Sequence, residues 1–243
     1  MWSDVLVAFI SLVAGAVAAV TGFGIGSLLT PLLALQVDTR VAVAAVSIPH
    51  LIGTAVRFWL LQGEVDRRVL SRFGLASAAG GLVGAVLQGW ASGRWLSATF
   101  GFLLIFAAAS EVAGLTRRMH LRGWVAWLAG ACSGFLGGLV GNQGGIRSAA
   151  LLGFDLSRQT FVATATAVAL LVDCARVPVY LVTQYDEATD LVSWMAVATV
   201  GVTVGTILGN RVLVRIPDVW FRLVLVVVLV SLGGAMLVRA ARQ

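Results

Sequence analysis

The feature that most limits the possible folds of this sequence is a succession of eight apolar segments joined by short polar loops. Six of them are about 19–24 residues long, the length that one α-helix needs to cross about 30 Å of hydrocarbon. Only 12% of the 243 residues are charged and 59% are hydrophobic, so the charges are too few to cover a soluble domain. The sequence therefore predicts an all-α, polytopic membrane protein. The segments run through 5–35, 41–62, 73–91, 95–115, 124–153, 160–183, 191–209 and 219–238.

Composition also excludes several functions. In a membrane chain the formal net charge of +6 reports orientation first, so no nucleic-acid partner is expected. The two cysteines, Cys132 and Cys174, form no CxxC pair and have no metal-ligand spacing, so no disulfide, metal or cofactor is expected. The N-terminal MWSDVLVAF has no basic region and no small-residue cleavage site, which predicts a retained first helix.

The first and fifth segments, each about 30 residues, are too long for one ordinary crossing. Both contain glycine-rich breaks, TGFGIGS at Thr21–Ser27 and GNQGGIRS at Gly141–Ser148. Unpaired backbone groups in lipid cost several kcal/mol each, so a broken helix is tolerated only when it packs in protein or lines a cavity. Glycines could instead serve helix packing alone. Packing does not explain why Asn142, Gln143 and Arg147 lie beside the second break.

The two halves of the chain resemble each other, which predicts a duplication with a first repeat at 1–118 and a second at 119–243. An offset of 119 residues superimposes glycines and one arginine, and an offset of 121 superimposes two later glycines. Each half would contain a glycine-broken hairpin or discontinuous helix plus three transmembrane helices. The matched pairs are Gly15 and Gly134, Gly22 and Gly141, Gly26 and Gly145, Arg57 and Arg176, Gly80 and Gly201, and Gly84 and Gly205.

The loop arginines indicate the orientation. If each long segment enters the membrane and returns, nine loop arginines share one side and four lie on the other, whereas single crossings give only eight against five. The positive-inside rule favours the first arrangement, with the arginine-rich face cytoplasmic, both termini and 184–190 periplasmic, and the halves inverted. The nine are Arg67, Arg68, Arg72, Arg117, Arg118, Arg122, Arg158, Arg211 and Arg215.

Two glycine-rich motifs begin the two halves, and an apolar run follows each. They are AGAVAAVTGFGIGSLLTPLLAL (Ala14–Leu35) and SGFLGGLVGNQGGIRSAALLGF (Ser133–Phe154). The pair resembles the sulfite exporter TauE/SafE family over nearly the whole chain. The resemblance implies a transporter of sulfite, sulfonates or other small organosulfur or carboxylate anions. The second motif departs from the family pattern, because Asn142 and Gln143 replace small residues and Arg147 follows.

The candidate site combines both breaks. A half-helix that starts after a break presents free N–H groups and a positive dipole end, which attract anions. Two such ends would meet near the midplane, the usual substrate position in repeat-built transporters. Arg147 offers a guanidinium fork that matches a sulfonate edge, although it could also snorkel. The predicted anion-binding residues are Gly22, Gly24, Gly26, Ser27, Asn142, Gln143, Gly144, Gly145, Arg147 and Ser148.

Four other polar residues are predicted at membrane depth. Asp173 and Arg176 are three residues apart, so they share a helix face and are expected to pair. Arg57 and Arg176 are candidates for a charge that supports the site, with snorkelling or structural pairing as the alternative. His50 and Asp173 are candidates for proton coupling, although a histidine like His50 is more often a hydrogen-bonded packing residue.

These features predict a secondary transporter of a small anion, and the family resemblance implies export of sulfite or an organosulfonate across the bacterial inner membrane. The alternatives are a passive channel for small anions and a carrier of small carboxylates. An enzyme is not expected, because no Ser/His/Asp or HExxH constellation lies at depth, and GLVGNQGG lacks the ending of a Walker A loop. The expected partners are the lipid bilayer and a small anion, and the sequence permits a homodimer.

Overall fold

The computed structural model describes residues 4–21, 24–113, 123–141, 144–154, 156–212 and 218–243. Within these residues the regular structure is helical, as the sequence predicts. Seven described helices are long and apolar enough to span a membrane, which confirms a multi-pass membrane fold. They are Asp4–Thr21, Thr39–Glu64, Arg67–Gln88, Gly93–Val112, Gln159–Thr183, Val192–Gly209 and Leu223–Arg242.

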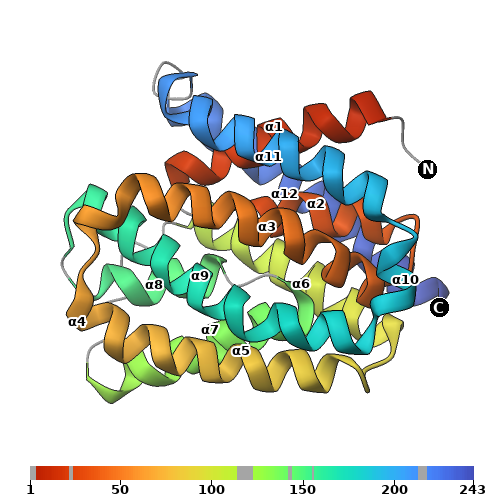
Figure 1. Cartoon of the computed structure of the whole chain (residues 1–243), viewed down its shortest axis with the longest axis horizontal. Helices are drawn as coiled ribbons and strands as arrows, with labels where there is room; N and C mark the ends of the chain where they lie inside the picture. The colour runs from red at the N-terminus through yellow and green to blue at the C-terminus, as the bar shows by residue number, and fades with distance from the viewer. Residues whose placement is uncertain (1–3, 22–23, 114–122, 142–143, 155, 213–217) are drawn as a thin grey trace.

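The helices form one bundle whose long axes run roughly side by side (Figure 1). Both chain ends and α10 lie at one end of the bundle, and α4 lies at the opposite end. The helices are α1 (Asp4–Thr21), α2 (Ile25–Ala34), α3 (Thr39–Leu61), α4 (Arg67–Val69), α5 (Leu75–Gln88), α6 (Gly93–Val112), α7 (Trp124–Val140), α8 (Gly144–Leu152), α9 (Arg158–Thr183), α10 (Tyr185–Thr189), α11 (Val192–Val212) and α12 (Asp218–Arg242). Two short turns complete the described elements, η1 (Gln62–Glu64) and η2 (Leu70–Gly74).

The two long apolar segments are each divided into two helices. In the first, α1 ends at Thr21 and α2 begins at Ile25. Gly24 has φ 136°, a backbone conformation that favours glycine. A Cβ there would lie 3.1 Å from the side chain of Val17 on α1. The start of α2 therefore folds back against α1. In the second segment, α7 ends at Val140, its C-cap Gly141 has φ 75°, and α8 begins at Gly144.

Glycines bring two pairs of helices into close backbone contact. On α11, a Cβ at Gly205 would collide with the carbonyl oxygen of Leu12 on α1. On α5, a Cβ at Gly84 would collide with the carbonyl oxygen of Phe135 on α7. The first glycine of each repeat motif does the same, Gly15 against α11 and Gly134 against α5. We call the α1–α11 and α5–α7 contacts the two glycine seams. Their close approach is typical of helix packing in membranes.

The third span begins six residues earlier than the apolar pattern indicates. The carboxylate of Asp66 accepts hydrogen bonds from the backbone N–H groups of Arg68 (2.8 Å) and Val69 (2.9 Å). This N-cap stabilises a helical start at Arg67, although the arginines there interrupt the hydropathy. A π-helical turn, η2, then leads into α5. The side-chain N-cap of Asp66 thus determines where the third span begins, and hydrophobicity does not.

Candidate functional site: a buried charged cluster between two helix breaks

The two glycine breaks lie against each other inside the bundle. A Cβ added to Gly26, in the first turn of α2, would collide with the carbonyl oxygen of Gly141 at the end of α7. The same Cβ would lie 3.8 Å from Cδ2 of His50. A Cβ on Gly141 would lie 3.5 Å from the hydroxyl of Thr30 on α2 and 3.6 Å from Nη1 of Arg176. The breaks, distant in sequence, therefore border one polar region.

A three-residue network joins α3 to α9 beside the breaks. The Nδ1 atom of His50 donates to Oδ2 of Asp173 at 2.6 Å. Oδ1 of Asp173 accepts from Nε of Arg176 at 2.9 Å and lies 2.8 Å from its Nη2. Asp173 is 0% exposed and Arg176 2% exposed. The predicted pairing of Asp173 with Arg176 is confirmed. His50 is hydrogen-bonded at the packed surface between the two helices.

Arg57 and Arg176 make equivalent backbone contacts, which the sequence did not predict. Arg57 Nη1 donates to the carbonyl oxygen of Ala18, three residues before α1 ends. Arg176 Nη1 donates to the carbonyl oxygen of Gly137 at 2.6 Å, three residues before α7 ends. The acceptors differ by 119 residues, the same offset as the arginines. Each guanidinium thus neutralises the negative C-terminal end of a broken helix.

Arg147 lies inside the protein and does not snorkel to its surface. It is in the first turn of α8, and only 2% of its surface is exposed. Its charge interacts with the charges of Asp173 and Arg176, and with that of Arg57. The buried charged residues of the described part are thus three arginines and one aspartate, with His50 at the edge. We call Arg57, Arg147, Asp173, Arg176 and His50 the charged cluster.

The other predicted anion-binding residues divide into those that the structure describes and those that it does not. Gly24, Gly26 and Ser27 are buried at the start of α2, and Gly144 is buried at the start of α8. Gly145 and Ser148 are in α8, where Ser148 is half-buried. Gly22, Asn142 and Gln143 lie outside the described residues.

Tyr180 also belongs to this region, although the sequence analysis did not single it out. It is 1% exposed, its hydroxyl donates to the carbonyl oxygen of Gly138 on α7, and its ring centroid lies 6.0 Å from the guanidinium carbon of Arg176. The spacing of four residues from Arg176 places both side chains on one face of α9. The sequence spacing therefore indicates that Tyr180 lies near Arg176. It does not indicate that Gly138 is the hydrogen-bond acceptor of Tyr180.

The fold and the charged cluster define a class of protein. Many apolar helices surround charged groups buried at depth between discontinuous helices, an arrangement that is typical of membrane transporters. A family model described as "Sulfite exporter TauE/SafE" matches residues 7–236. The chain therefore belongs to this family of membrane transporters, as its two motifs indicated. Comparison with curated proteins gives no match, and comparison with solved structures gives none.

Proposed function

We propose that this chain is a secondary transporter that exports sulfite or an organosulfonate across the bacterial inner membrane. The observation that carries the proposal is the composition of the charged cluster. The guanidinium groups of Arg57, Arg147 and Arg176 are buried there beside the carboxylate of Asp173. Guanidinium groups donate charge-assisted hydrogen bonds to small oxyanions, so an anion that enters the cluster would be stabilised there. The half-helix starts of α2 and α8 would add backbone donors.

We also propose that the halves 1–118 and 119–243 are inverted repeats. Two observations support this. Arg57 and Arg176 bond to carbonyl oxygens related by the same offset of 119 residues. The seam of α1 with α11 has a counterpart in the seam of α7 with α5, as an exchange of halves requires. The cytoplasmic side would be the α4 end of the bundle, where the arginine-rich loops begin and end.

Flux measurements with purified protein in liposomes test this function. We expect saturable uptake of radiolabelled sulfite, with competition by methanesulfonate and little by acetate. Flux that rises linearly with concentration would instead indicate a passive channel, and strong competition by acetate a carboxylate carrier. A deletion strain with unchanged tolerance to sulfite, sulfonates and thiosulfate, together with no flux in liposomes, would contradict the proposal.

Arg147→Lys tests the central guanidinium. Lysine keeps the charge but loses the bidentate fork, and hydrogen bonds to charged groups contribute about 1.5–3 kcal/mol. We therefore expect sulfite affinity to fall roughly 10–100-fold, measured by binding to purified protein, while the yield stays the same. Arg94→Lys, at an exposed position on α6, is the matched control and is expected to bind normally. If both Arg147→Lys and Arg147→Ala bind sulfite as tightly as the parent, Arg147 does not belong to the binding site.

His50→Gln tests the proposed proton coupling. Glutamine can still hydrogen bond toward Asp173, but it carries no titratable proton near neutral pH. We expect sulfite binding to persist while the dependence of transport on a proton gradient disappears. The matched control is His120→Gln, at the only other histidine of the chain. If transport by His50→Gln depends on the proton gradient as strongly as transport by the parent, His50 has a packing role only.

A further inference from the structure

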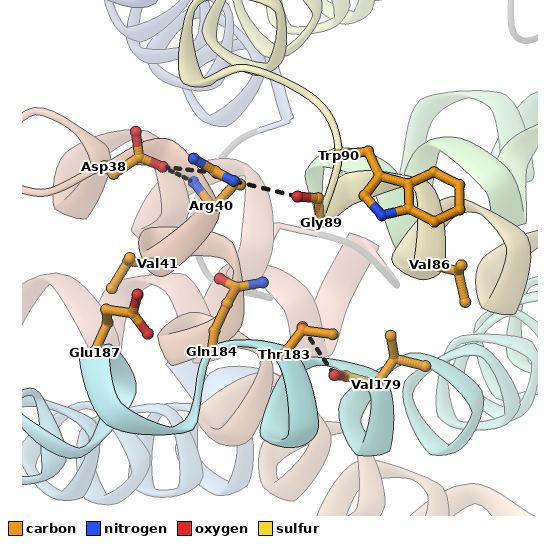
Figure 2. A pocket seen from close by; sticks show the side chains of 10 residues that line it. All are labelled: Asp38, Arg40, Val41, Val86, Gly89, Trp90, Val179, Thr183, Gln184 and Glu187. Atoms are coloured by element: carbon orange, nitrogen blue, oxygen red, sulfur yellow. Dashed lines mark hydrogen bonds and ion pairs between the residues drawn. The ribbon is translucent and has the colours of Figure 1, made fainter.

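A cavity of about 580 Å³ opens at the α10 end of the bundle. The start of α3, the end of α5 and the end of α9 form its walls, and α10 adds Glu187 (Figure 2). Its charged groups are Arg40, Asp38 and Glu187. Arg40 donates to the carbonyl oxygen of Gly89 at 3.2 Å and lies 3.5 Å from the Asp38 carboxylate. Because carboxylates accompany its arginine, this cavity would hold water and would retain an anion only weakly.

Helices α3 and α9 both line the cavity and carry residues of the charged cluster. On α9, Val179 lines the cavity and Arg176 lies three residues earlier, a rise of about 4.5 Å. On α3, Val41 lines the cavity and His50 lies nine residues later, a rise of about 14 Å. The cavity therefore reaches to within about one helical turn of the cluster along α9.

An apolar cluster lies between the two along α3, where Val43 and Ala44 come between Val41 and His50. It consists of Val43, Ala44, Ala85 and Tyr180, which form a buried cluster with Val179 packed against it. None of the four is more than 4% exposed. Val43 also contacts the helix break, because a Cβ on Gly141 would lie 3.3 Å from its side chain. We call these four residues the apolar layer.

Tyr180 connects the apolar layer to the charged cluster. Its hydroxyl donates to the carbonyl oxygen of Gly138, which holds α9 against the end of α7 next to the second break. Its ring lies 6.0 Å from the guanidinium carbon of Arg176. An anion that engages Arg176 would therefore lie next to Tyr180. Tyr180 thus belongs to the apolar layer and lies beside the proposed binding site.

We propose that the cavity is the vestibule at one end of the anion route, and that the apolar layer is its gate, closed in this structure and fastened by Tyr180. This inference rests on the proposed transport function. The anion would leave the cluster, pass the layer when the hydrogen bond of Tyr180 to Gly138 breaks, and regain its hydration among the charged groups of the cavity. The vestibule faces the periplasm if the positive-inside orientation holds.

Cysteine accessibility tests the vestibule. The chain has only Cys132 and Cys174, so Cys132→Ser with Cys174→Ser provides a background without thiols. In that background we expect a membrane-impermeant thiol reagent to label Val41→Cys from the α10 side only. Val43→Cys, within the gate itself, is expected to react at least ten times more slowly. Equal labelling of the two positions, or no labelling of Val41→Cys from either side, would overturn the proposal.

Tyr180→Phe tests the gate. It keeps the ring and removes one buried hydrogen bond, so we expect labelling of Val43→Cys to become about fivefold faster. Tyr185→Phe is the matched control, because Tyr185 is the only other tyrosine and is exposed. An unchanged rate in Tyr180→Phe would leave Tyr180 without a gating role. Should that variant fail to fold, labelling of Val43→Cys in the background, with and without methanesulfonate, decides whether the layer opens.

A blocking measurement separates this inference from the proposed function. A bulky maleimide attached to Val41→Cys, with excess reagent removed, is expected to reduce sulfite flux in liposomes at least tenfold. Normal flux after complete labelling would overturn the vestibule while the transport function stands. Absence of sulfite flux in the unlabelled protein would instead refute the transport function, and the labelling pattern would still show whether the layer closes the cavity.

Discussion

Asp173→Asn is expected to lower the thermal stability of the purified protein more than any other single polar substitution in the described bundle. Asparagine has nearly the same shape, and with the other tautomer of His50 it can keep hydrogen bonds to His50 and Arg176. The variant therefore isolates the loss of charge. Arg176 would lose the carboxylate to which it is bonded, and breaking a buried ion pair costs about 3–5 kcal/mol. The expected fall in melting temperature in detergent is on the order of 10 °C.

Two further measurements distinguish this charge effect from a packing defect. Asp186→Asn, at an exposed position on α10, is the matched control and is expected to melt like the parent. Adding sulfite should restore much of the stability of Asp173→Asn, because the anion would supply the missing negative charge and binding stabilises the folded state. A variant that melts within about 2 °C of the parent would show that the cluster does not depend on this carboxylate.

The second large effect is expected from Gly26→Ala. A single methyl group at this position would collide with the carbonyl oxygen of Gly141, a backbone atom that cannot rotate away. The start of α2 and the end of α7 would then be pushed apart beside His50, whose Cδ2 lies 3.8 Å from the added Cβ. Overpacking of this kind costs about 1–3 kcal/mol, so we expect a folded protein with a distorted site. Sulfite flux should fall at least tenfold, more than thermal stability would suggest.

The control for this prediction is Gly234→Ala on α12. A Cβ there would have nothing within 4 Å, and alanine is the better helix former. We expect parental flux and equal or slightly higher stability. If Gly26→Ala transports sulfite at the parental rate, the contact between the two breaks has no role in transport, and the breaks would serve packing alone.

The sequence predicted the parts of this fold that depend on short-range patterns. The apolar segments predicted the spanning helices, and excess length together with glycines predicted the division of the first and fifth segments. The spacing of Asp173 and Arg176 predicted their ion pair, since residues three apart on a helix are neighbours. In each case the deciding information lies within about one helix.

The sequence did not predict contacts that depend on how helices meet. For Arg57 the sequence leaves open a charge that supports the site, snorkelling or structural pairing. Its acceptor is the backbone carbonyl of Ala18, and no side-chain pattern marks a carbonyl oxygen. For Arg147 the sequence leaves both anion binding and snorkelling open, because the sequence of α8 does not show which side of that helix faces the bundle. Tyr180 was missed for the same reason, since its partner Gly138 has no side chain to signal the contact.

The glycine seams also determine the order in which the protein can be completed during synthesis. Helix α1 packs against α11, and Gly15 contacts Val202 across this seam. Val202 is synthesised 187 residues after Gly15, so the contact cannot form before then. At about 5–20 residues per second, ribosomes need roughly 10–40 s to make that length of chain. During this interval α1 lies in the membrane without α11, its partner across the seam, so the seam closes only after most of the chain has been made.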